Sequence, residues 1–138
     1  YNPTVFVKKE HVFFIADDDL DDQELFIKAL KEIDNSCYCI TALNGEDALY
    51  KLENEKHHPP DLIFLDLNMP KVNGKQCLKA IKLNQDLKDI PVIIYSTSAE
   101  KKEILETTQL GAAFFMQKPN RFIELRDALN QIILHNWS

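Results

Sequence analysis

A set of polar and charged residues shares one trait, which is that each member stands at the end of a short apolar run. The set comprises Asp17 and Asp18 after residues 12–16, Asp66 after 62–65, Ser96 and Thr97 after 92–95, and Lys118 shortly after 112–116. If these side chains meet, carboxylates, a hydroxyl and an ammonium group would share one pocket. Such groups bind a divalent cation and accept a phosphoryl group.

The chemistry of such a pocket follows from its charges. Three carboxylates within a few ångströms repel one another, which raises the pKa of at least one unless a cation is present. Mg²⁺ fits best, with Mn²⁺ as a substitute, because it binds one or two carboxylates and keeps waters that a phosphate can replace. We therefore expect Asp66 to be the nucleophile, Lys118 to neutralise the phosphoryl oxygens and Ser96 to hydrogen-bond the product.

Five apolar runs of strand length must position these residues. They cover residues 12–16, 37–42, 62–65, 92–95 and 112–116. Segments with helical periodicity separate them, and continuous apolar runs are typical of parallel strands covered on both sides. The sequence thus predicts an α/β fold, a five-stranded parallel doubly wound sheet with helices on both faces. Ligands of such sheets bind at the carboxyl ends of the strands, where the set would meet.

Bulk properties limit the classes of function. The length of 138 residues indicates one domain, which we expect over residues 10–135, with an N-terminal extension (1–9), a short tail (136–138) and no effector domain. A net charge of -6 disfavours direct nucleic-acid binding. No apolar stretch approaches the roughly 18 to 20 residues of a membrane helix, and no signal-peptide pattern is present. We expect a cytoplasmic protein without membrane contact.

Other potential metal ligands are interpreted as structural. Cys37, Cys39 and Cys77 are odd in number and lack the spacing of a disulfide framework or a zinc site, so we expect apolar filler. His57 and His58 precede two prolines, which indicates a solvated loop.

On these motifs the chain resembles a response-regulator receiver domain of two-component signalling over approximately residues 10–135. The motifs are Asp17-Asp18, the run from Asp66 to Pro70, Ser96, and Lys118-Pro119. The resemblance implies a flavodoxin-like fold with strand order 2-1-3-4-5. It also implies phosphorylation of Asp66 by a histidine kinase or a phosphotransfer domain.

The family's site residues transfer to matching positions. The resemblance makes Asp17 and Asp18 the acidic metal pair, with Asp18 preferred as direct ligand, and adds the backbone carbonyl of Asn68. Ser96 takes the place of the switch hydroxyl, and Lys118 that of the lysine that pairs with the phosphoryl group.

Some implications of the resemblance concern the switch and its rate. The switch aromatic falls on Phe115, which has no phenolic hydroxyl. Ser98 and Asn68 would modulate the access of water to the acyl phosphate. The resemblance also implies a cis peptide between Lys118 and Pro119.

Three further acids, Asp19, Asp21 and Asp22, make the first loop more acidic than the family requires. We interpret them as charges at a helix N-terminus, with indirect support of the metal as the alternative.

The resemblance implies a signalling phosphoacceptor that assists its own phosphorylation and slow dephosphorylation, and not an enzyme. Its downstream protein partner would bind the face formed by the fourth helix, fifth strand and fifth helix.

Three other readings are weighed against it. A haloacid dehalogenase-like phosphatase needs an acid/base aspartate where this chain has Asn68. A flavodoxin-like flavin carrier needs a loop without the acids of residues 17–19. A non-phosphorylated pseudo-receiver would bind partners without needing all the site residues.

Overall fold

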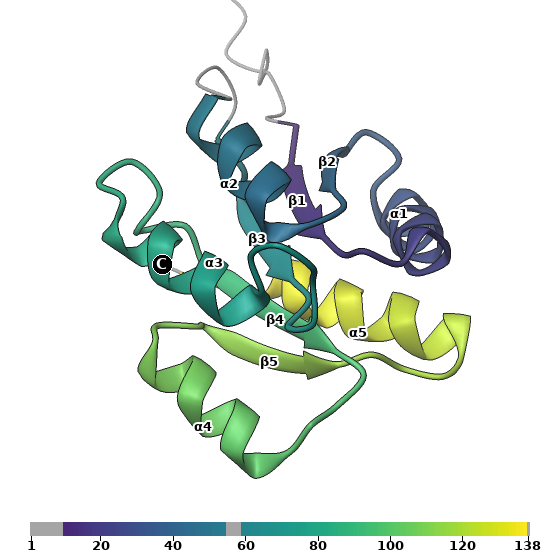
Figure 1. Cartoon of the computed structure of the whole chain (residues 1–138). Coiled ribbons are helices and arrows are strands. Elements are labelled where there is room, and N and C mark those ends of the chain that lie inside the picture. The colour runs from purple at the N-terminus through teal and green to yellow at the C-terminus, as the bar shows by residue number, and fades with distance from the viewer. Residues whose placement is uncertain (1–9, 55–58, 138) are drawn as a thin grey trace, which may run out of the picture.

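Strands and helices alternate along the whole described chain (Figure 1). The computed structural model describes residues 10–54 and 59–137. The strands are β1 (Val12–Ala16), β2 (Tyr38–Ala42), β3 (Leu62–Leu65), β4 (Val92–Ser96) and β5 (Phe114–Gln117). The helices are α1 (Leu20–Ile33), α2 (Gly45–Asn54), α3 (Gly74–Leu83), α4 (Lys101–Gln109) and α5 (Phe122–Leu134). The expected extension over 1–9 and the His57-His58 loop lie outside the described residues.

The sheet is parallel throughout, with strand order β2-β1-β3-β4-β5. The expected fold class and strand order are therefore confirmed. β1 pairs with both β2 and β3, so the direction of winding reverses beside it. The carboxyl ends of β1 and β3 consequently flank the switch point, where open α/β sheets bind their ligands.

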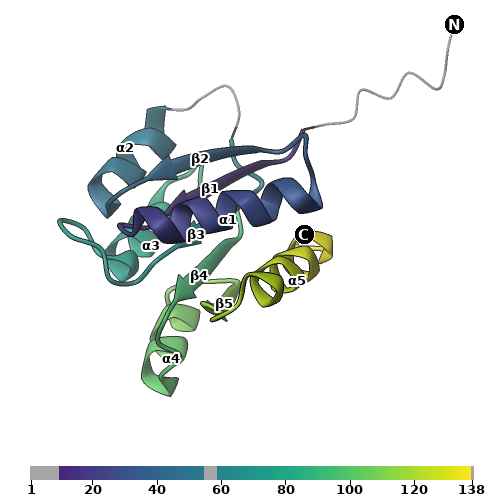
Figure 2. The ribbon, with the colours of Figure 1, turned by 90° about the vertical axis from the view of Figure 1, so that its right-hand side faces the viewer.

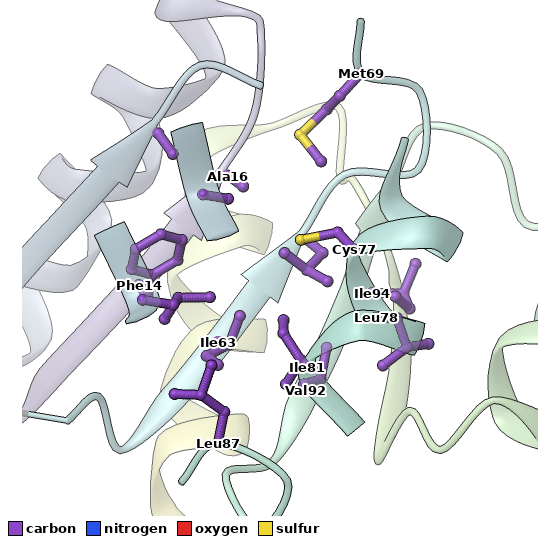
Figure 3. Close-up of a cluster of buried hydrophobic side chains, with 14 of the residues drawn as sticks. Phe14, Ala16, Ile63, Met69, Cys77, Leu78, Ile81, Leu87, Val92 and Ile94 are labelled. Atoms are coloured by element: carbon purple, nitrogen blue, oxygen red, sulfur yellow. The ribbon is translucent and has the colours of Figure 1, made fainter. Parts of the chain in front are cut away.

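Two hydrophobic cores cover the two faces of the sheet. Figure 2 shows α1 and α5 together on one side of it, where Phe13 and Ile15 of β1 pack with apolar residues of both helices. Phe14 and Ala16 point to the other side, because successive strand residues alternate between faces. There they join side chains of α2 and α3, including Cys77 (Figure 3).

Polar side chains define where several helices begin. The Asp19 carboxylate accepts a hydrogen bond from the backbone N–H of Asp22, which caps α1. Asn73 and Gln76 form a reciprocal capping box at the start of α3. Such caps satisfy backbone donors that have no partner within the helix.

Three strands have boundaries that differ from the predicted ones. β2 begins at Tyr38, one residue later than expected, and β4 includes Ser96. β5 covers Phe114–Gln117 and not 112–116. The reason at β5 is the turn that ends α4: Gly111 has a φ of 105°, and the next N–H bonds back to the carbonyl of Thr107. Of the two apolar residues after this turn, Ala113 already donates its N–H to the Val92 carbonyl at 2.8 Å, but the register with β4 begins only at Phe114.

The cysteines are free thiols, and Cys37 and Cys77 are buried in the two cores while Cys39 is half-buried. Their interpretation as apolar filler is thus confirmed for the two buried residues. Within the described ranges, none of the helices combines the length and hydropathy needed to span a bilayer.

Candidate functional site

The pairing of β1 with β3 brings two aspartates to neighbouring positions. Ala16 and Leu65, the last residues of the two strands, are partners in the sheet. The next residues are Asp17 and Asp66, and the Asp66 N–H donates to the Ala16 carbonyl at 3.0 Å. Both carboxylates are nearly inaccessible, because Asp17 is 0% and Asp66 7% exposed.

Asp18 completes a group of three carboxylates. One oxygen from each of Asp17, Asp18 and Asp66 lies within 4.8 Å of the others. The three come from two loops, which confirms that the predicted acidic residues meet at one edge of the sheet. Carboxylate oxygens at this spacing are a suitable donor set for a hard divalent cation. The residues present therefore fit the expected metal.

The pKa values of the buried acids reflect their crowding. Burial, opposed by the Lys118 ammonium and reinforced by the negative charge of Asp17, raises the pKa of Asp66 to about 6. Burial also raises the pKa of Asp17, against the hydrogen bond from Lys118. Loss of hydration disfavours the charged form of each carboxyl group, so a bound cation would stabilise both.

Lys118 supplies a positive charge from the position directly after β5. Its Nζ lies 2.6 Å from Asp17 Oδ2, 2.8 Å from Asp22 Oδ2 and 3.8 Å from Asp66 Oδ2. It also lies 5.1 Å from the centre of the Tyr95 ring. Burial lowers the pKa of the ammonium, but the hydrogen bonds to Asp17 and Asp22, together with the negative charges of Asp66 and Asp17, outweigh it and the pKa is raised. Lys118 is therefore charged at neutral pH.

Ser96 is the last residue of β4 and is fully buried. Its hydroxyl oxygen accepts a hydrogen bond from the Ser98 N–H at 3.2 Å. Its carbonyl accepts one from the Lys118 N–H at 2.7 Å, so the serine at the end of β4 and the lysine directly after β5 are held side by side. Phe115, the expected switch aromatic, is half-buried and packs against the core on the α2 and α3 side.

The expected cis peptide between Lys118 and Pro119 is wrong. None of the peptide bonds within residues 10–54 and 59–137 is cis. Trans is the more stable isomer of an X-Pro bond by about 0.5–1 kcal/mol, and Lys118 makes its contacts with the site in that form.

Close backbone packing fixes the loop between β3 and α3. A Cβ atom added to Gly45 would lie 2.0 Å from the Val72 carbonyl oxygen, so the start of α2 lies directly on this loop. Within the loop, the Asn68 N–H is 3.5 Å from Asp66 Oδ1. The loop that carries the candidate phosphoacceptor is thus packed against the start of α2.

Two contacts of the site are not predicted by the sequence pattern. The pattern indicates a helix N-terminal charge at Asp22, yet this residue shares the Lys118 ammonium with Asp17. Gln23 is not among the predicted site residues, yet its buried Nε2 donates to the carbonyls of Asp17 and Ala42, at 2.7 and 2.8 Å. Its amide ties the end of β1 to that of β2. A glutamine on the buried face of a helix was the one available signal.

Comparison with known sequences identifies relatives of this arrangement. The sequence profile described as "Response regulator receiver domain" matches residues 13–130. A protein-glutamate methylesterase/protein-glutamine glutaminase of Clostridium acetobutylicum is 38% identical over 86% of this chain and 34% of its own length. Response regulator Rcp1 of Synechocystis is 30% identical over 83% of this chain and 80% of its own. The chain thus spans only about a third of the methylesterase.

Solved structures agree with the sequence comparison. The phosphorylated cyanobacterial phytochrome response regulator RcpA superposes with a TM-score of 0.83 at 29% identity, over 90% of this chain and 91% of its own. The Mn²⁺-bound form of Rcp1 gives a TM-score of 0.78 at 30% identity, over 88% and 91% of the two chains.

Proposed function

This chain belongs to the response regulator receiver domain family, and from that membership we propose that Asp66 accepts a phosphoryl group from a phosphohistidine. A receiver domain of two-component signalling implies a phosphodonor kinase and a downstream effector. One observation carries the assignment to Asp66: its buried carboxylate lies within 4.8 Å of two further carboxylates and 3.8 Å from the Lys118 ammonium.

The transfer needs little chemistry from the protein. An Asp66 oxygen would form the new O–P bond while the P–N bond of the donor breaks, and the imidazole nitrogen would keep the electron pair and take up a proton. Negative charge on the oxygens of the transferring phosphoryl group is the main obstacle to the reaction. A fixed positive charge nearby stabilises these oxygens and so lowers the barrier. Lys118, already charged and 3.8 Å from Asp66, would supply that charge.

We propose Mg²⁺, or Mn²⁺ in its place, as the cofactor. Asp17, Asp18 and Asp66 would hold it together with the backbone carbonyl of Asn68. When bound, the ion would neutralise the carboxylates and the phosphoryl oxygens. The carboxylate spacing within 4.8 Å supports this proposal, as does the relative whose structure is described as Mn²⁺-bound.

The phosphoryl group would act on the rest of the fold through Ser96. Its hydroxyl, which accepts a hydrogen bond from the Ser98 N–H, would instead donate one to the acyl phosphate. α4 and Phe115 would change position together with it. Ser98 and Asn68 are proposed to set how easily water reaches the acyl phosphate. A partner that binds the phosphorylated conformation more tightly would then shift the population of the domain toward that conformation.

The proposed partner surface consists of α4, β5 and α5. Leu105, Phe114 and Ile123, one from each element, are 59%, 49% and 47% exposed. Exposed apolar side chains on adjacent elements are a common feature of protein interfaces. We propose the cytoplasm as location, since free thiols suit a reducing compartment.

We propose a phosphoacceptor and not a hydrolytic enzyme. An efficient phosphatase with an aspartate nucleophile needs a proton donor for the leaving group. The amide of Asn68, two residues after Asp66, cannot serve as one.

Incubation with Mg²⁺ and a small acyl phosphate tests the proposal. Intact-mass spectrometry should show one added phosphoryl group in the wild type and none in Asp66→Asn or in excess EDTA. Asp86→Asn, an exposed aspartate after α3, is the matched control and should react like the wild type. Failure of the wild type to gain an Asp66-dependent phosphoryl group would overturn the assignment. Steady hydrolysis of unrelated phosphate monoesters would favour the phosphatase.

A further inference from the structure

We propose that Asp22 is a positioning residue, which holds the Lys118 ammonium away from Asp66 and so lowers the affinity of the site for a phosphoryl group. This inference rests on the proposed function. It concerns one contact of Lys118, the ion pair to the first turn of α1.

The distances around Lys118 show that its hydrogen bonds are divided. An ammonium group has three N–H donors. Two are directed to Asp17 and Asp22, whose oxygens lie at 2.6 and 2.8 Å. The Asp66 oxygen, at 3.8 Å, lies beyond hydrogen-bond distance. The residue that would bear the phosphoryl group is thus the most distant of the three acids around the ammonium.

Asp22 differs from Asp17 in what it can do. The Asp17 side chain is completely buried and belongs to the three-carboxylate group, whereas the Asp22 side chain is 32% exposed and lies outside that group. The backbone N–H of Asp22 is bonded to the Asp19 cap, so its place on α1 is fixed. Asp22 is therefore an anchor for the ammonium that contributes no ligand to the proposed metal.

The surroundings give the Asp22 carboxylate room to release the ammonium. Asp22 and Lys118 line an open cleft of about 620 Å³, together with residues of the β5–α5 loop. Water in this cleft can hydrate a carboxylate that turns away from Lys118. When a phosphoryl group draws the ammonium toward Asp66, the contact with Asp22 is the one that must lengthen.

Asp21 offers a matched comparison. It is one residue earlier, in the same first turn of α1, and is also acidic, but its side chain is exposed. Removing either charge changes the helix dipole interaction and the net charge in the same way. Only removal of the Asp22 charge would break an ion pair of Lys118.

The test compares Asp21→Asn, Asp22→Asn and Asp22→Glu with the wild type. Affinity for beryllofluoride, an analogue of the phosphoryl group, is measured at saturating Mg²⁺. Loss of a partly exposed ion pair changes an equilibrium by about two- to fivefold, so Asp22→Asn should bind that much more tightly than Asp21→Asn. Asp22→Glu keeps the carboxylate and should remain close to the wild type. Circular dichroism verifies folding of each variant.

A spectroscopic measurement examines the ion pair itself without any phosphoryl analogue. The ¹H–¹⁵N signal of the Lys118 ammonium should shift in Asp22→Asn and stay in place in Asp21→Asn. Equal affinities of the two asparagine variants, or weaker binding by Asp22→Asn, would overturn the inference. If the wild type shows no Asp66-dependent binding of beryllofluoride, the proposed function fails, while an unchanged ammonium signal in Asp22→Asn refutes the role of Asp22 independently.

Discussion

Gly74 lies directly against the backbone of Asp66. A Cβ atom at Gly74 would lie 2.3 Å from the Asp66 carbonyl oxygen, and the Gly74 N–H donates to the carbonyl of Leu67 at 2.9 Å. The first residue of α3 therefore packs onto the peptide that carries the candidate nucleophile. No side chain fits at this contact without moving the backbone.

Gly74→Ala should destabilise the protein. Alanine favours helices over glycine by about 1 kcal/mol, but forced overpacking costs about 1–3 kcal/mol, and here the clash is with backbone. We expect a lower midpoint of urea denaturation. Lys79→Ala, at an exposed position of the same helix, should change the free energy of unfolding by less than about 0.5 kcal/mol. A more stable Gly74→Ala protein would show that the contact is looser than described.

The raised pKa of Asp66 predicts how stability depends on pH in metal-free buffer. Because the folded-state pKa of about 6 exceeds the ordinary 3.8, the folded state binds more protons between these values, and its stability falls as pH rises through this window. Asp66→Asn removes this loss of stability, because the asparagine side chain does not ionise. At pH 7 in EDTA it should raise the free energy of unfolding by about 1–3 kcal/mol.

Urea denaturation from pH 5 to 8 measures this difference. The gain from Asp66→Asn should shrink toward pH 5, where the Asp66 carboxyl is largely protonated. Adding Mg²⁺ should stabilise the wild type more than the variant, since a ligand that binds the folded state stabilises it. A gain that does not depend on pH would contradict the electrostatic explanation.

Ion pairs between one lysine of α3 and two glutamates of α4 lead to a prediction about how mobile α4 is. Lys75 lies 3.0 Å from Glu103 and 2.5 Å from Glu106, while Thr107 is the one buried residue of α4. Lys75→Met should speed hydrogen exchange of the α4 amides and lower global stability by less than about 1 kcal/mol. Lys102→Met, which contacts Glu106 within α4, is the control. Unchanged exchange in Lys75→Met would show that other contacts hold α4.

Burial of Cys77 predicts a protected thiol. Loss of hydration raises its pKa to about 12, so at pH 8 the reactive thiolate is scarce. Iodoacetamide should modify Cys77 in the folded protein far more slowly than in urea, as peptide mass spectrometry can follow. The folded-state pKa also lies above the ordinary 9.0, so stability should fall as pH rises above 9. Rapid alkylation of the folded protein would contradict this packing.

The apolar runs were sufficient to predict the sheet, because strands buried on both faces leave a continuous signal. The apolar runs were less informative about where strands begin and end and where turns lie. Residues 112 and 113 are apolar but lie in the turn around Gly111, whose positive φ delays the start of β5. Ser96 is polar and yet belongs to β4, since a buried strand can end on a hydroxyl that has a backbone partner.

Side-chain contacts between distant segments were harder to predict than residue classes. Asp17, Asp18 and Asp66 could be grouped because strand ends converge. The choice of Asp22 as a partner for Lys118 depends on how α1 leaves β1, which no local pattern specifies. The same holds for the buried amide of Gln23, which is bonded to two strand ends.

The ion pair between Lys118 and Asp17 joins residues 101 positions apart. During synthesis from the N-terminus, the acidic strand ends are complete long before the lysine leaves the ribosome. An incomplete chain thus carries Asp17, Asp18 and Asp66 without the lysine that lies beside them in the folded domain. We expect the proposed phosphoryl transfer to Asp66 to begin only once β5 has joined the sheet, because Lys118 follows that strand.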